Sequence, residues 1–316
     1  MISLITTALP FRDRAGVRQT NALRSWRAVF PGAEIFLMGD GEGYDEAAAS
    51  LGLIRVPDVA RGSGGLPRLD SLFEEGEKRA SFPYRGYINA DIILTSDMRK
   101  AVLEAPFHRF LLVAKRCNVD IEEALDVSDP SWEAVLLERV RNSGRVVRGD
   151  AIDIFLWKGP VWEAVPPMVI GRGKFDNWLI YAARRGGVPV VDASERALAI
   201  HQNHTYDHVP GGAAGAADGT EARENIRLAG GPDHLFTISD ADWRLTAQGL
   251  ERNYCDGDSR RCAEVDRILR GLERRCPLWL QAACEWRIRV QRARRGEWAP
   301  LLKFGFWLCG RITERR

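Results

Sequence analysis

Short apolar runs alternate with amphipathic segments along the first hundred residues. The apolar runs are typical of buried strands and lie at residues 2–9, 34–38, 53–56 and 84–94. Between them, apolar residues recur at helical spacing within residues 19–30, 46–51 and 66–80. Because strands separated by helices usually build parallel sheets, this half of the pattern predicts a sheet with helices on both faces.

The pattern becomes less regular beyond residue 100. We expect strands at residues 110–114, 151–157 and 188–192, and helices at residues 132–140 and 175–185. The Gly- and Ala-rich stretch 210–219 predicts a mobile loop, and residues 221–250 predict helix and loop.

Composition and charge narrow the class of protein. Hydrophobic residues make up 45% of the 316 residues and charged residues 28%, as in ordinary globular chains. A net charge of +2 gives no case for nucleic acid binding, which usually needs a strongly basic domain. The six cysteines form no C-x-x-C pair, which excludes zinc-ribbon and thioredoxin motifs. The N-terminus lacks a basic export signal and no run reaches about 18 apolar residues, so we expect a cytoplasmic protein.

Residues 276–316 form a basic C-terminal tail. They hold nine Lys or Arg against three Glu, with Trp and Phe among them. A basic amphipathic segment of this kind can lie in a membrane interface and contact anionic lipids, which would place the protein at the inner face of the membrane. It can equally pack on the rest of the chain or form a homodimer contact, and the sequence leaves these alternatives open.

The residues Asn89, Ala90 and Asp91 follow the strand-like run that begins at residue 84. Ligands of open α/β sheets bind beyond the carboxyl ends of the strands. An acidic residue there can hold a divalent cation, which prefers oxygen ligands and can bridge two phosphates. The alternative is that Asn89 and Asp91 cap the following helix, and spacing alone does not decide between the two.

A Gly-rich turn at residues 171–174 leads to Asp176 and Asn177 at the start of a predicted helix. The Asp176 carboxylate could accept a proton from a sugar hydroxyl as a general base. The alternative is a helix N-cap. Trp178 is either a platform for a sugar ring or a core side chain, and the core is the favoured place for a lone Trp.

Three of the five histidines lie between residues 201 and 208. His201 and His204 are spaced so that both can bind one metal ion or a phosphate, and the alternative is an exposed polar loop. Asp153 lies inside an apolar run. Since an unpaired carboxylate is costly to bury, it should point into a cleft or pair with a buried Arg.

In this order the motifs resemble those of the GT-A glycosyltransferases, over roughly residues 1–208. Asn89-Ala90-Asp91 is similar to their metal-binding motif after a central strand, with Asn89 in place of the first acid. Residues 171–177 resemble their acceptor-side motif with Asp176 as its single acid, and His201 or His204 resembles their further metal ligand. The run also looks similar to a group of bacterial glycosyltransferase-like proteins.

The resemblance implies a fold and a division of the chain. The fold is an α/β, Rossmann-like GT-A fold with a mixed, mainly parallel sheet flanked by helices and a C-terminal helical extension. The division is a catalytic domain at residues 1–208, a loop and helical extension at 209–275, and the basic amphipathic tail at 276–316.

The resemblance also implies roles for the site residues. Asp91, with His201 or His204, would hold Mn²⁺ or Mg²⁺, and Asp176 would be the catalytic base or acceptor anchor. The expected substrate-binding residues are Thr7, Arg68, Asp70, Asn89, Asp91, Asp153, Asn177 and Trp178. Thr7 follows the first strand, where these enzymes hold the nucleotide base, and Arg68 and Asp70 could reach ribose or diphosphate. Arg12 shares the place of Thr7 but is expected to be a surface charge.

The function implied is transfer of a sugar from a nucleotide-diphosphate donor to a carbohydrate or lipid-linked hydroxyl. A nucleotidyltransferase is less favoured, because residues 6–11 after the first strand hold no glycine for a phosphate loop. A sugar-nucleotide-binding protein without turnover is the other alternative, and Asn89 suggests it. The sugar, the base and the acceptor are not determined by the sequence.

Overall fold

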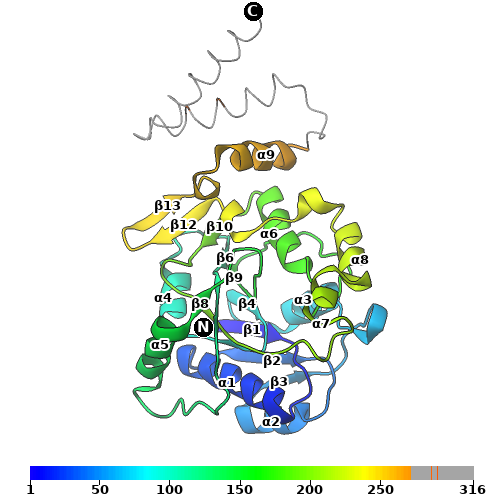
Figure 1. Cartoon of the computed structure of the whole chain (residues 1–316), viewed down its shortest axis with the longest axis vertical. Helices are drawn as coiled ribbons and strands as arrows, with labels where there is room; N and C mark the ends of the chain where they lie inside the picture. The colour runs from blue at the N-terminus through cyan, green and yellow to red at the C-terminus, as the bar shows by residue number, and fades with distance from the viewer. Residues whose placement is uncertain (272–285, 287–289, 291–316) are drawn as a thin grey trace, which may run out of the picture. The chain divides into compact units, whose positions relative to one another are not determined.

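The computed structural model describes residues 1–271 together with residues 286 and 290 (Figure 1). Its chain separates into two compact units, Met1–Glu251 and Arg252–Arg316. The predicted tail at 276–316 lies outside the described residues, apart from positions 286 and 290. None of the helices described is long and apolar enough to cross a membrane.

A nine-stranded sheet forms the centre of the first unit, in the order β13-β12-β10-β6-β9-β4-β1-β2-β3 (Figure 1). Neighbouring strands from β4 to β3 pair in parallel, as do β6, β10 and β12, whereas β9 runs antiparallel to both β4 and β6. The strands are β1 (Ile2–Thr6), β2 (Glu34–Met38), β3 (Ile54–Val56), β4 (Tyr84–Ile88), β6 (Phe110–Val113), β9 (Ile154–Lys158), β10 (Val190–Asp192), β12 (Trp243–Thr246) and β13 (Gly249–Arg252). The predicted mixed, mainly parallel sheet is therefore confirmed.

Helices cover both faces of this sheet, because its strands carry apolar side chains on both sides. Leu4 of β1 packs in the main core with Trp26 of α1 and Met98 of α4. The next residue of β1, Ile5, lies on the opposite face against Gly76 of α3. The helices of the first unit are α1 (Asp13–Val29), α2 (Tyr44–Leu51), α3 (Leu69–Arg79), α4 (Ser96–Glu104), α5 (Trp132–Ser143), α6 (Phe175–Arg185), α7 (Gly212–Asp218) and α8 (Thr220–Leu228). The second unit contains α9 (Ser259–Leu269).

A second, four-stranded sheet has the order β5-β11-β7-β8. Its strands are β5 (Ile92–Ile93), β7 (Arg116–Val119), β8 (Arg145–Val146) and β11 (Ala199–Gln202). A small core that includes Ile93, Ile200 and Leu136 of α5 packs against it. Because β5 directly follows Asp91 and β11 contains His201, their antiparallel pairing brings two distant motifs side by side.

Three sequence predictions need correction. Residues 84–94 are two strands in different sheets, because the chain turns at residues 89–91. The predicted mobile loop at 210–219 contains α7, whose Ala216 carbonyl accepts a hydrogen bond from the Gly173 backbone N–H at 2.9 Å. Residues 221–250 contain β12 and part of β13 besides helix and loop, since Trp243 and Arg244 pair with β10. The division at residue 208 stays a prediction, although the main sheet takes in two strands beyond it.

Candidate functional site

Asp91 lies in the turn between β4 and β5, beyond the carboxyl end of β4. This is the edge of a parallel sheet where ligands bind in open α/β folds. The next helix, α4, begins at Ser96 with Thr95 as its N-cap. The alternative interpretation of Asn89 and Asp91 as caps of the following helix is therefore wrong.

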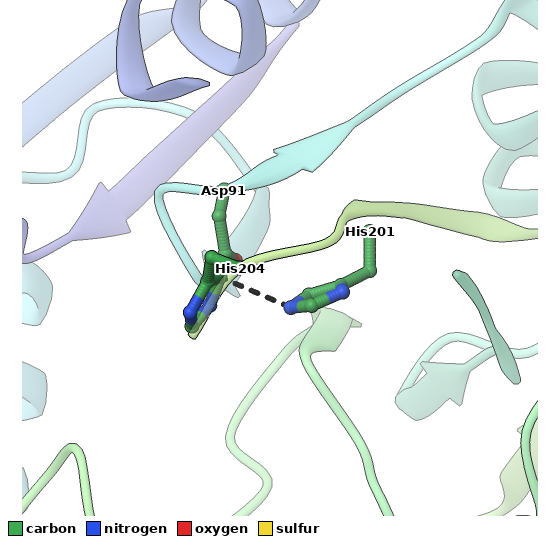
Figure 2. Close-up of side chains that lie close together, drawn as sticks. All are labelled: Asp91, His201 and His204. Atoms are coloured by element: carbon green, nitrogen blue, oxygen red, sulfur yellow. Dashed lines mark hydrogen bonds and ion pairs between the residues drawn. The ribbon is translucent and has the colours of Figure 1, made fainter. Parts of the chain in front are cut away.

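Two histidines approach the Asp91 carboxylate (Figure 2). The Nε2 atom of His204 lies 3.1 Å from Asp91 Oδ2, and the Nε2 atom of His201 lies 3.4 Å from the same oxygen. One ligand atom from each of the three residues falls within 4.8 Å of the others. The His201 side chain is 5% exposed and that of His204 11%, so the alternative of an exposed polar loop does not describe these two residues.

The cluster is strongly coupled electrostatically. Burial would raise the pKa of Asp91, but the charges and hydrogen bonds of His201 and His204 outweigh it and hold that pKa far below its usual range. The hydrogen bond that His204 donates to Asp91 raises the pKa of His204 in turn, against the opposing effect of burial. The carboxylate is thus kept ionised, as a cation ligand must be.

Two atoms of the cluster lack a hydrogen-bond partner although they are buried. They are Asp91 Oδ1 and His201 Nδ1. Unpartnered buried polar atoms are uncommon and suggest a ligand, ion or water at the position. One carboxylate and two imidazoles fit a transition-metal ion such as Mn²⁺ better than Mg²⁺, which prefers oxygen ligands throughout. These residues therefore fit a divalent cation, and the identity of the ion stays a prediction.

Gln202 secures the backbone around the cluster. Its side-chain amide is fully buried and donates to the carbonyls of Arg18, at 2.8 Å, and Asp91, at 3.1 Å. Its carbonyl oxygen accepts from Asn21 at 3.1 Å. These bonds join α1, the Asp91 turn and β11. They also bring Arg18 beside the site, where its charge interacts with Asp91.

Asp153 pairs with a buried arginine, one of the two outcomes predicted for it. Its residue is 8% exposed, and its Oδ2 lies 3.3 Å from Arg116 Nη1. Its Oδ1 accepts a hydrogen bond of 2.6 Å from the Asn89 amide, whose own oxygen accepts one of 2.9 Å from the Tyr87 hydroxyl. Burial raises the pKa of Asp153, and Arg116 acts in the opposite direction.

Asp176 lies in the first turn of α6. Its carboxylate accepts hydrogen bonds from the backbone N–H groups of Lys174, at 3.1 Å, and Ile152, at 3.3 Å. Lys174 has a φ of 89°, a strained conformation for a non-glycine residue. Burial, with a contribution from Asp153, raises the pKa of Asp176 to about 6. Asp176 is therefore not the N-cap of α6, which is Lys174, although its carboxylate holds the turn before the helix. Its pKa suits a general base.

Other predicted residues serve packing or pair with one another. Asn177 is buried, and its amide donates to the Phe236 carbonyl at 2.9 Å. Trp178 is 7% exposed, which makes it a core side chain rather than a sugar platform. Arg68 Nε donates to Asp70 Oδ1 at 3.1 Å at the start of α3.

The residues predicted at the end of β1 lie near the aromatic ring of Tyr44 or at the surface. The Thr7 side chain lies beside the Tyr44 hydroxyl, and its Oγ1 would be 3.7 Å from a β-carbon at Gly39. Arg12 pairs with Glu42 at 3.1 Å, with both side chains 64% exposed, and is a surface charge as expected.

Sequence reasoning missed Arg18, Tyr87, Arg116, Gln202 and Tyr206. Arg116 lies in the short polar strand β7, which has no apolar run to reveal it. Tyr206 lies within the histidine-rich segment, and its ring centroid is 5.1 Å from that of His204. The density of polar and aromatic residues in that segment is the only signal that points to Tyr206.

Comparisons with known proteins give likenesses of fold. No family model matches the chain, and no curated protein matches it. The chain is similar to the structure of S. aureus TarS 1–349, with 13% identity over 64% of this chain and 57% of that chain and a TM-score of 0.37. It is similar to M. tuberculosis glucosyl-3-phosphoglycerate synthase, with 14% identity over 73% of this chain and 81% of that chain and a TM-score of 0.44.

Another structure of the M. tuberculosis synthase contains Mn²⁺, uridine diphosphate and phosphoglyceric acid. It matches with 15% identity over 73% of this chain and 79% of that chain, at a TM-score of 0.44. The chain spans less than two thirds of the TarS 1–349 chain that it matches. These likenesses concern the fold, so the residues of the site carry the functional argument.

Proposed function

We propose that the chain is a glycosyltransferase that moves a sugar from a nucleotide-diphosphate donor to a hydroxyl group of a carbohydrate or lipid-linked acceptor. The observation that carries this proposal is the convergence of Asp91, His201 and His204 at the carboxyl edge of the parallel strands. A cation site at this edge suits a diphosphate, whose charge must be offset when the bond to the sugar breaks.

Asp91, His201 and His204 would hold the cation. When bound, Mn²⁺ or Mg²⁺ would neutralise negative charge on the leaving diphosphate. Arg18 adds a positive charge beside Asp91 and would help to bind the phosphates.

Asp176 would act as the base or as the anchor of the acceptor. As base, its carboxylate takes the proton of the acceptor hydroxyl while that oxygen bonds to the anomeric carbon of the donor sugar. The bond from the anomeric carbon to the diphosphate breaks, and its electron pair leaves with the diphosphate. A pKa of about 6 leaves most Asp176 side chains ionised at neutral pH and still basic enough to accept the proton.

The nucleotide-binding end would lie near Thr7, at the carboxyl end of β1. Arg68 and Asp70 would contact ribose or diphosphate only if their mutual hydrogen bond opened. Contact of residues 276–316 with a membrane surface, and a homodimer, are further proposals that rest on the sequence of that tail.

A donor screen with matched variants tests the proposed function. The full chain would be mixed with a panel of nucleotide sugars, with MnCl₂ or with a chelator, and followed by thermal unfolding and by release of nucleoside diphosphate. We expect one donor to raise the unfolding temperature only with metal and to be slowly hydrolysed. Asp91→Ala should abolish both effects. Asp97→Ala is the control, because that exposed aspartate is paired with Lys100 on α4.

Two outcomes would contradict the proposal. One is that no nucleotide sugar stabilises the protein with or without metal. The other is that Asp91→Ala behaves like Asp97→Ala. Metal-dependent donor binding with no nucleotide release, and no transfer to any acceptor tested, would favour the binding protein without turnover.

A further inference from the structure

A continuous chain of polar side chains runs behind the proposed metal ligands. The Tyr87 hydroxyl donates to Asn89, the Asn89 amide donates to Asp153, and Arg116 pairs with the second oxygen of Asp153. The charge of Arg116 also interacts with the side chain of Tyr206. These five residues, called the polar chain below, come from β4, the turn after β4, the segment before β9, β7 and the loop after β11.

The polar chain links both sides of the metal site. At one end, Asn89 lies two residues before Asp91. At the other end, the Tyr206 ring is 5.1 Å from the ring of His204. The side chains near Asp91 and His204 are therefore connected through the largely buried ion pair of Asp153 and Arg116, whose side chains are 11% and 15% exposed.

We propose that the polar chain positions the metal ligands from both sides, and that residue 89 is an amide because it must donate to Asp153. Asn89 is then a positioning residue and neither a metal ligand nor a remnant of a lost acid. The inference rests on the proposed function only for the role of the metal. The hydrogen bonds themselves are independent of it.

The hydrogen bonds of Asn89 explain why an acid is excluded there. Its amide nitrogen is 2.6 Å from a carboxylate oxygen of Asp153, and its amide oxygen accepts from Tyr87. Both polar ends of the side chain are thus already engaged. A carboxylate at residue 89 would face the Asp153 carboxylate at hydrogen-bond distance, and two such groups cannot both ionise at moderate cost. The departure from the two-acid motif therefore follows from the local hydrogen bonding.

An exchange of the two side chains tests the direct contact. In Asn89→Asp/Asp153→Asn, the new carboxylate at position 89 would accept from Tyr87 and from the new amide at position 153, and the oxygen of that amide would accept from Arg116. Each single variant instead places two acids or two amides face to face. With a chelator present, we expect each single change to lower the unfolding temperature by about 5 °C or more, and the exchange to recover most of the loss.

Manganese binding measured by calorimetry gives a second, non-catalytic readout. Asn89→Asp should not tighten Mn²⁺ binding, since residue 89 is not a ligand. Tyr206→Phe should weaken it about tenfold with little change in unfolding temperature, because the loop of His204 loses the hydroxyl that interacts with Arg116. Arg14→Lys, an exposed change on α1, is the control and should bind Mn²⁺ like the natural chain.

The outcomes separate this inference from the proposed function. The inference is overturned if the double variant lowers the unfolding temperature by as much as the two single variants added together. It is also overturned if Asn89→Asp tightens Mn²⁺ binding about tenfold or more. It is also overturned if Tyr206→Phe binds Mn²⁺ like the natural chain. If the natural chain binds no metal, the metal-assisted form of the proposed function fails, and the exchange still tests the hydrogen bonds in the chelated protein.

Discussion

At the scale of single residues, Asp176 shows how burial and hydrogen bonding compete. Backbone N–H groups stabilise its ionised form, but burial and the nearby Asp153 outweigh them and raise its pKa to about 6. The sequence identified this aspartate by its place after a Gly-rich turn. Its pKa depends on Asp153, 23 positions earlier in the chain, and so could not be inferred from the local sequence.

The raised pKa of Asp176 predicts two pH effects. The proton of Asp176 is held more tightly in the folded protein than in the unfolded chain, where the pKa is near 3.8. The natural chain should therefore lose about 3 kcal/mol of stability relative to Asp176→Asn as pH rises from about 3 to about 7, and about two thirds of it between pH 4 and 6. Turnover should decline below about pH 6, where the base is protonated. Denaturant unfolding across pH and pH–rate profiles measure the two effects.

Asp97→Asn serves as the control for these measurements, because Asp97 is on the exposed surface of α4. The difference in free energy of unfolding between Asp97→Asn and the natural chain should not change with pH as the difference for Asp176→Asn does. An unfolding free energy of Asp176→Asn that runs parallel to that of the natural chain between pH 4 and 6 would refute the raised pKa.

At the scale of elements, apolar runs identified most strands of the main sheet because β1, β2, β4, β6, β9 and β10 are largely buried on both faces. The apolar pattern did not predict β7 and β8, since both strands are short and contain polar residues. The end of β4 before Asn89 was predicted, whereas β5, which follows the turn and joins the second sheet, was not distinguished within the apolar run 84–94. The second sheet is set by pairing between distant segments, which local periodicity does not report.

Trp26 of α1 secures the strand that follows Asp91. Its fully buried indole N–H donates to the Ile92 carbonyl of β5 at 2.7 Å. Trp26→Phe should cost about 1–3 kcal/mol by leaving that carbonyl unsatisfied. It should also weaken Mn²⁺ binding, since Ile92 is bonded directly to Asp91 in the chain. Denaturant unfolding and calorimetry measure the two effects.

Trp162→Phe is a matched control for this prediction. Its indole also donates to a backbone carbonyl, that of Leu179 in α6, at 3.0 Å. The control should lose stability without losing Mn²⁺ affinity. Equal effects of both changes on Mn²⁺ binding would show that Trp26 has no particular link to the site.

At the scale of the whole molecule, charge is unevenly distributed along the sequence. The net charge of +2 arises although residues 276–316 carry nine Lys or Arg against three Glu, so the remainder is slightly acidic. An acidic body would be repelled by anionic lipid headgroups, and only the tail would be attracted to them. Membrane contact through the tail therefore stays a specific prediction from the sequence.

Vesicle sedimentation tests the membrane prediction on the full chain. We expect binding to vesicles that contain phosphatidylglycerol, weaker binding to neutral phosphatidylcholine vesicles, and loss of binding as salt is raised. Changing Arg292, Arg294 and Arg295 together to Glu should abolish it. The same change at the exposed arginines 24, 99 and 141 is the control. Equal binding by both triple variants would rule out the tail as the contact.

The α/β class could be inferred from the sequence, and Asp91 with His201 or His204 could be proposed as a site at the carboxyl edge of the sheet, because burial and strand ends leave local patterns. The approach of His201 and His204 to Asp91 follows from the tertiary structure, since both histidines lie more than a hundred positions later in the chain. The tertiary structure also decided that Asp153 pairs with Arg116, that Asn89 donates to Asp153, and that Asn177 and Trp178 serve packing. These outcomes depend on which strands pair and in what register, and pairing energy is shared between segments that no local pattern connects.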